Sequence, residues 1–133
     1  MKVTDPNASH CPVEVTLAVI GGKWKPLILW HLYEGGVRRF LELQRNIPGI
    51  TRKMLTQHLR ELERDGVVAR KIFNEMPLRV EYSLTKYGRT LSPLMHVLAD
   101  WGSKHEARVA KNGQTGPWNV KPGAPKRMPI AIG

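Results

Sequence analysis

Five side chains with cationic or hydrogen-bonding groups lie close together between residues 52 and 60. They are Arg52, Lys53, Thr56, Gln57 and Arg60. Arginine and lysine can donate to guanine O6 and N7, glutamine can form two hydrogen bonds with adenine, and threonine can contact a base edge or the thymine methyl group. On a helix that buries Leu55, Leu59 and Leu62, all five fall largely on the outward side. The spacing predicts a DNA-facing helix surface. The alternative is a solvated face on which the arginines pair weakly with nearby acidic residues.

The residues before this helix have the signals of a helix-turn-helix motif. A short helix is expected over about residues 39–46, and Pro48-Gly49 forces a turn. Thr51 is a suitable N-cap for the next helix, which should end at Gly66. In a helix-turn-helix, the first turns of the second helix enter the major groove, and the positive N-terminus of that helix favours a nearby phosphate.

The other elements complete a recognisable order. Helices are expected over Pro12–Ile20, over about Lys25–Gly35 and from Thr85 onward, and β-rich strands over Val67–Phe73 and Val80–Leu84. The order is helix, helix, helix-turn-helix, hairpin, helix. It predicts a mainly α fold with a small β-hairpin wing, which is a winged helix-turn-helix.

Further cations flank the expected recognition helix. Arg79 lies at the end of the hairpin loop, where a wing can neutralise phosphate, although a single charge on an exposed turn is an equal alternative. Arg39, at the start of the third helix, is a candidate backbone contact. The predicted DNA contacts are Arg39, Thr51, Arg52, Lys53, Thr56, Gln57, Arg60 and Arg79.

Charge and composition narrow the class of protein. The 133 residues hold 21 Lys and Arg against 11 Asp and Glu, a net charge of +10, and a compact basic protein attracts polyanions. The hydrophobic fraction of 41% is enough for a core, and no apolar run reaches the roughly 20 residues needed to span a bilayer. The first residues show no secretory signal, and one cysteine cannot form an internal disulfide. We expect a cytoplasmic protein with no membrane partner.

The composition also divides the chain into three parts. Residues 112–133 are rich in Gly and Pro and contain three basic residues and no acidic one, which predicts a flexible basic tail. Residues 1–10 are expected to be an N-terminal arm. The folded domain should therefore occupy residues 11–111.

Several blocks of sequence occur together in an order that resembles a known family. They are Cys11-Pro12-Val13-Glu14, Ile20-Gly21-Gly22-Lys23-Trp24, Ile47-Pro48-Gly49-Ile50-Thr51, Leu59-Arg60-Glu61-Leu62-Glu63, Val80-Glu81-Tyr82-Ser83-Leu84-Thr85 and Trp101-Gly102. Over about Cys11 to Gly102 the chain resembles the HxlR-type family of bacterial transcription regulators, which is related to the MarR type. The resemblance implies a homodimeric winged helix-turn-helix protein that binds a roughly palindromic double-stranded DNA operator.

The resemblance also implies that the first and last helices form the dimer interface. In this chain the corresponding residues are Val13, Leu17, Ile20, Leu91, Leu94, Leu98 and Trp101. The amount of apolar surface on both terminal helices supports a covered face, although packing within one subunit is the alternative.

Cys11 stands directly before a helix that begins at Pro12, where the helix N-terminus stabilises a thiolate. The resemblance implies a sensor of oxidants, quinones or aldehydes at this place. Since there is no second cysteine, only a disulfide between two copies of Cys11, a small-thiol adduct or an electrophile adduct is open to it. The alternative is a small apolar residue buried under the interface.

No feature of the sequence indicates catalysis. The five histidines lack metal-ligand spacing, and there is neither a Gly-rich phosphate loop nor a catalytic triad. We therefore expect no enzyme activity, no metal and no cofactor. Trp24, Trp30 and Tyr33 favour core packing, with a pocket for an aromatic effector as the alternative. The leading prediction is a sequence-specific transcription regulator, most simply a repressor. The alternative is a non-specific nucleic-acid-binding or architectural protein.

Overall fold

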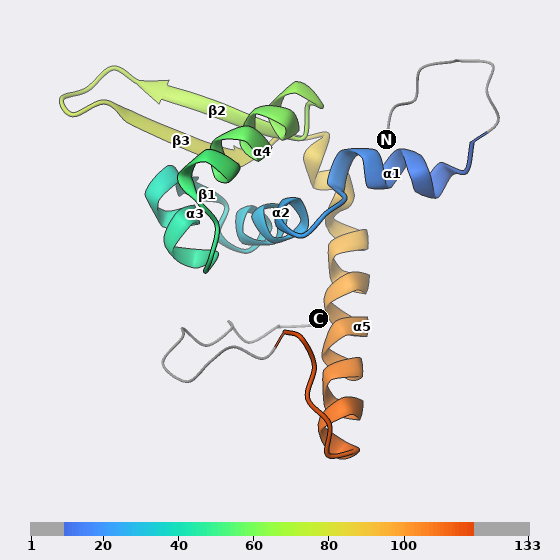
Figure 1. Ribbon diagram of the computed structural model, residues 1–133. Coiled ribbons are helices and arrows are strands. Elements are labelled where there is room, and N and C mark those ends of the chain that lie inside the picture. The colour runs from blue at the N-terminus through green and yellow to red at the C-terminus, as the bar shows by residue number, and fades with distance from the viewer. Residues whose placement is uncertain (1–9, 119–133) are drawn as a thin grey trace. The chain divides into compact units, whose positions relative to one another are not determined.

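The computed structural model describes residues 10–118, and the chain divides into two compact units, one ending at Thr90 and the other beginning at Leu91. In chain order, the first unit contains α1 (Pro12–Ile20), α2 (Trp24–Gly35), β1 (Val37–Arg39), α3 (Phe40–Asn46), α4 (Arg52–Arg64), β2 (Val68–Phe73) and β3 (Arg79–Leu84) (Figure 1). A 3-10 turn, Gly88–Leu91, then leads to α5 (Ser92–Lys111) in the second unit. The predicted mainly α, winged helix-turn-helix fold is confirmed.

The wing is part of a three-stranded antiparallel sheet with the order β1-β3-β2. In the β2–β3 hairpin Val68 lies opposite Leu84 and Phe73 lies opposite Arg79. Figure 1 shows the loop end of this hairpin reaching beyond the helices of its unit. The sequence did not predict β1, because three residues are too few to show an alternating pattern. Pairing with the free edge of β3, and not local propensity, makes those residues extended.

The hydrophobic core of the first unit lies between α2, α3, α4 and the sheet. Its fully buried side chains are Ile28, Leu29, Leu32, Leu43, Ile47, Leu55, Leu59, Leu62, Val67 and Val68. The three leucines predicted to face inward from α4 are among them. Burial of this stripe fixes which side of α4 faces solvent.

Local signals define both ends of α4. Thr51 is the N-cap, and its Oγ1 accepts a hydrogen bond from the Met54 N–H at 3.1 Å. At the other end Gly66 has φ of +78°, a left-handed conformation that glycine adopts without strain. The Val67 N–H then donates to the Leu62 carbonyl at 3.1 Å. The chain thus leaves α4 directly into the first wing strand.

Thr85 caps a 3-10 turn, and α5 begins only at Ser92, so the expectation of one helix from Thr85 is corrected. The Thr85 Oγ1 donates to the Gly66 carbonyl at 2.6 Å and accepts from the Gly88 N–H at 2.8 Å. A Cβ atom at Gly88 would meet the backbone of Val67 well inside van der Waals contact. The end of β3 is therefore tied closely to the turn between α4 and β2.

In the second unit α5 is followed by a turn at Asn112-Gly113, where the Gln114 N–H donates to the Val109 carbonyl at 3.0 Å. The Trp118 ring lies edge-on to His105, with ring centroids 5.8 Å apart. The predicted N-terminal arm, except for its last residue, and residues 119–133 of the predicted tail lie outside the described residues. Within residues 10–118, no helix has the length and apolar character needed to cross a membrane.

Candidate nucleic-acid interface

The N-terminal half of α4 exposes the predicted base-reading residues. Arg52, Lys53, Gln57 and Arg60 are exposed, and Thr56 is half-buried. The Thr56 hydroxyl donates to the Arg52 carbonyl at 2.8 Å, which leaves its methyl group and oxygen lone pairs for other contacts. The structure therefore brings these five residues together on one helix.

Arg52 also connects the two helices of the helix-turn-helix. Its guanidinium lies over the Phe40 ring of α3, 5.4 Å from the ring centroid. A cation above an aromatic face at this distance is attracted by the ring quadrupole. The contact orients Arg52 at the start of α4, where the helix N-terminus favours phosphate.

Charge is divided along α4. The acidic residues of its C-terminal end are engaged within the protein: Glu61 with Lys25 of α2 at 2.6 Å, Glu63 with Arg70 of β2 at 3.5 Å, and Asp65 with Arg64 at 3.7 Å. Only the last is a local pair of the kind that the sequence suggested. Within residues 10–118, Arg52, Lys53 and Arg60 form no ion pair, so the basic half of the helix keeps its positive field.

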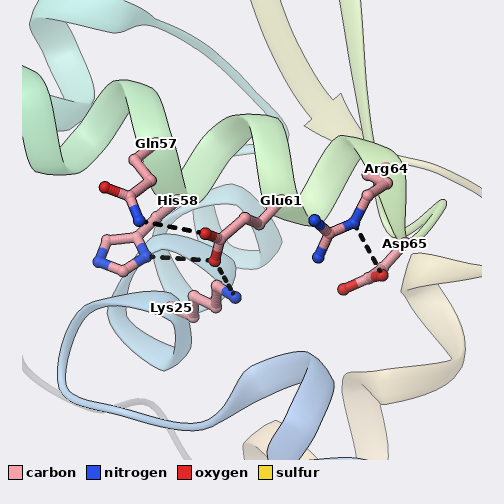
Figure 2. A network of polar contacts seen from close by, with 6 residues as sticks. All are labelled: Lys25, Gln57, His58, Glu61, Arg64 and Asp65. Carbon is pink, nitrogen blue, oxygen red and sulfur yellow. Dashed lines mark hydrogen bonds and ion pairs between the residues drawn. The ribbon is translucent and has the colours of Figure 1, made fainter. Parts of the chain in front are cut away.

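Lys25 and Glu61 form a polar network that the sequence analysis did not identify. Lys25 is only 8% exposed, and Glu61 receives its ammonium together with the amide Nε2 of Gln57, which lies 3.3 Å away (Figure 2). His58 Nδ1 lies 4.0 Å from the same carboxylate. The hydrogen bonds from Lys25 and then Gln57 hold the pKa of Glu61 below its ordinary value.

A signal for Lys25 was present in the sequence. Lys25 precedes Ile28, Leu29 and Leu32 at helical spacings of three, four and seven, and so occupies a position of the apolar stripe of α2. A lysine in such a position requires a partner when the helix packs. The sequence could not tell which acidic residue that partner would be.

The wing holds Arg79 among groups of its own hairpin. Its guanidinium lies 2.9 Å from Glu75 and 3.3 Å from Glu81, and 3.8 Å above the Phe73 ring. These two carboxylates neutralise much of the Arg79 charge. Among the residues predicted to contact DNA, Arg79 is therefore the least available to bind a phosphate. Arg70 and Lys71, on β2, are exposed.

Arg39 ends β1 and stands at the N-cap position of α3. Its backbone N–H donates to Glu42 Oε1 at 2.9 Å, and its side chain is exposed. The Arg39 guanidinium is therefore available to solvent at the start of α3.

The residues predicted for a dimer interface differ in exposure. In the first unit Val13 is 60% and Leu17 is 51% exposed, whereas Ile20 is buried. In the second unit Leu98 is 48% and Trp101 is 66% exposed. Leu91 and Leu94 are half-buried, and Leu91 belongs to the 3-10 turn. Val15 on α1 and Val97 on α5, which are outside the predicted set, are exposed as well.

Cys11 is exposed and is the N-cap residue of α1, with Pro12 in the first turn. Its carbonyl accepts a hydrogen bond from the Glu14 N–H at 2.9 Å. Between residues 10 and 118 no group of three or more His, Cys, Asp or Glu side chains is arranged to hold a metal ion.

A helix-turn-helix with an exposed basic recognition helix, followed by a hairpin wing, defines the class of winged helix-turn-helix DNA-binding regulators. The sequence comparisons identify the family within that class. A sequence model of the HxlR-like helix-turn-helix family matches residues 19–110, and the chain belongs to this family.

Individual relatives agree with this assignment. The chain is 52% identical over 101 residues to the HTH-type transcriptional regulator YdeP of Bacillus subtilis (strain 168). The matched region covers 76% of this chain and 78% of YdeP. The solved structure of the redox regulator HypR in its oxidized form has a TM-score of 0.68 and 51% identity over 71% of this chain and 96% of HypR. The solved structure of HypR in its reduced form has a TM-score of 0.70 and 47% identity over 77% of this chain and 99% of HypR. The chain is a DNA-binding transcription regulator and not an enzyme.

Proposed function

We propose that this regulator is a repressor that binds a roughly palindromic operator as a homodimer. The observation that carries the proposal is the exposed, ion-pair-free basic half of α4, because it presents base-reading side chains beside a helix N-terminus. Arg52, Lys53, Thr56, Gln57 and Arg60 read bases in the major groove. Thr51, Arg39 and the wing with Arg79 hold the sugar-phosphate backbone.

A second copy of the chain covers the exposed apolar residues of α1 and α5. Val13, Leu17, Leu98 and Trp101 would otherwise leave large apolar side chains in water. A two-fold dimer also places two copies of α4 on half-sites one helical turn apart. Size-exclusion chromatography with light scattering should give the mass of a dimer at micromolar concentration, and a monomer would reject this part of the proposal.

A competition experiment tests sequence-specific binding. Labelled DNA from the region flanking the regulator's own gene is bound at fixed salt and challenged with excess random-sequence duplex. A specific regulator remains bound to the labelled fragment, since its affinity for a specific site is typically about 10³-fold or more higher than for random DNA. Loss of the labelled fragment in proportion to competitor would favour the alternative, a non-specific or architectural binder.

The repressor assignment needs a separate measurement. A reporter driven by the protected region should be expressed more strongly when the regulator is absent. Footprints that overlap the promoter elements would agree with this, because a bound dimer would then exclude polymerase. Lower reporter expression in the absence of the regulator would identify an activator.

We further propose that Cys11 senses oxidants or electrophiles. Its exposure at the start of α1 supports this, and so does the similarity to the redox regulator HypR. Treatment with diamide or an aldehyde should weaken operator binding, and Cys11→Ser should abolish that response. If the serine variant responded like the wild type, Cys11 would not be the sensor.

A further inference from the structure

The amide group of Gln57 is oriented by a carboxylate. Gln57 Nε2 lies 3.3 Å from Glu61 Oε2, one turn further along α4. An ionised carboxylate only accepts hydrogen bonds, so the amide must turn its NH₂ group toward Glu61 and its oxygen away. Figure 2 shows the Gln57 oxygen on the side opposite to Glu61.

Glu61 is itself fixed from the neighbouring helix. Lys25 Nζ of α2 lies 2.6 Å from Glu61 Oε1, and its side chain is only 10% exposed. The two oxygens of the Glu61 carboxylate thus have different partners. Oε1 contacts Lys25 of α2, and Oε2 accepts from Gln57. Because α2 packs in the core through Ile28 and Leu29, this anchor does not depend on a flexible surface side chain.

We propose that Glu61 is a specificity-determining positioning residue, which Lys25 anchors and which fixes the Gln57 amide for recognition of adenine. One N–H of Gln57 is used by Glu61, and the other N–H and the Oε1 atom remain. Adenine offers the complementary pair in the major groove, an N7 acceptor and an N6 donor. This inference rests on the proposed base reading by Gln57.

The fixed orientation of the Gln57 amide is what makes base recognition selective. An amide that can flip presents either its oxygen or its nitrogen at a given place, and so accepts partners of either polarity. Glu61 removes that freedom while touching no base. Loss of Glu61 should therefore change which base is preferred, and not only how tightly DNA is bound.

The test selects bound sequences from a randomised double-stranded DNA library with the wild-type protein, Gln57→Ala and Glu61→Gln. In Glu61→Gln the new amide can donate or accept, so it no longer fixes the orientation of Gln57. The wild type should prefer adenine at one position of each half-site. We expect Gln57→Ala to lose the base preference at that position. Glu61→Gln should flatten the same position, with discrimination reduced about fivefold or more, the lower end of what a bidentate contact supplies.

Glu63→Gln is the matched control. It also removes one negative charge from α4, but Glu63 is paired with Arg70 and not with Gln57. It should alter overall affinity in the same direction as Glu61→Gln and leave the adenine preference intact. If Glu61→Gln unfolds the protein, Lys25→Met/Glu61→Gln removes both charges of the pair and should show the same flattened position in a folded protein, which thermal unfolding verifies.

The outcomes separate the two proposals. Full adenine preference in Glu61→Gln, with its loss in Gln57→Ala, would overturn the role of Glu61 alone. A position read by Gln57 that prefers another base would also overturn it. Failure of the wild-type protein to enrich any sequence would overturn the proposed specific function, and this inference with it.

Discussion

The Lys25 ammonium of α2 lies 2.6 Å from the Glu61 carboxylate of α4, and Lys25 is buried to 8% exposure. The pair connects a core helix to the C-terminal end of the recognition helix. Removing one charged partner of a buried pair is costly, since the remaining charge loses its compensation, whereas removing both together can be nearly neutral.

The two single variants of this pair should differ in stability. Glu61→Gln leaves the buried ammonium without a charge partner and should lower the free energy of unfolding by about 1–3 kcal/mol, less than for a fully buried pair because Glu61 keeps 27% of its side chain in solvent. Lys25→Met should cost less, because Glu61 can regain water. The double variant should lie near the wild type. Urea unfolding of all four proteins at one protein concentration checks this, and additive losses would contradict it.

Stability should also depend on the protonation of Glu61. The pKa of Glu61 in the folded protein is lowered from its ordinary value of 4.5 by the hydrogen bonds from Lys25 and Gln57. Its contribution is therefore fully present above pH 4.5 and is lost as the pH falls through the folded pKa. Unfolding free energies of the wild type and of Lys25→Met/Glu61→Gln are measured from pH 7 to pH 3. The two proteins should be similar near pH 7, and the wild type should lose stability relative to the double variant below pH 4.5. A difference that did not change with pH would contradict this.

Thr51 should act as the cap of the recognition helix. Its hydroxyl oxygen accepts the Met54 N–H, so Thr51→Ala should lower the free energy of unfolding by about 1 kcal/mol. Thr51→Ser keeps the oxygen and should retain most of the stability. Thermal or urea unfolding measures both variants, and equal losses for Ala and Ser would show that the hydroxyl does not matter.

Gly88 should not tolerate even one added methyl group. A Cβ atom there would press on the Val67 carbonyl, and overpacking of this kind costs about 1–3 kcal/mol. Gly102→Ala is the comparison, since beyond the adjacent residues and the nearby backbone of α5 nothing in the described chain lies within 4 Å of its added Cβ. In the middle of α5 that change should stabilise by up to about 1 kcal/mol. Unfolding experiments that gave both changes the same sign would contradict the prediction.

Two basic residues should differ in how they contribute to the salt dependence of DNA binding. Arg39 is exposed, forms no ion pair within residues 10–118 and is proposed to bind phosphate, so Arg39→Ala should reduce the slope of log K against log salt by about 0.9 per subunit. Arg79 already lies beside Glu75 and Glu81, so Arg79→Gln should reduce the slope by less. Binding titrations at several salt concentrations measure both. A larger effect for Arg79 would show that it leaves its carboxylates on DNA.

Local patterns were enough to predict most of the fold. The leucine stripe of α4, the Thr51 cap and the Pro48-Gly49 turn are signals within a few residues of one another, and each fixes backbone geometry locally. The alternation of Val80, Tyr82 and Leu84 predicted the second wing strand for the same reason. The strand β1 and the 3-10 turn at Gly88 were missed, because they depend on pairing and contact with distant residues.

The sequence by itself determined that a basic, base-reading helix face exists, since helical periodicity alone places Lys53, Gln57 and Arg60 opposite the buried leucines. Only the tertiary structure decided which charges stay available on that face. Packing of α2 against α4 pairs Lys25 with Glu61, and packing of α4 against β2 pairs Glu63 with Arg70. Ion pairs depend on distances of a few ångströms between residues far apart in the chain, and those distances are set by how the elements pack.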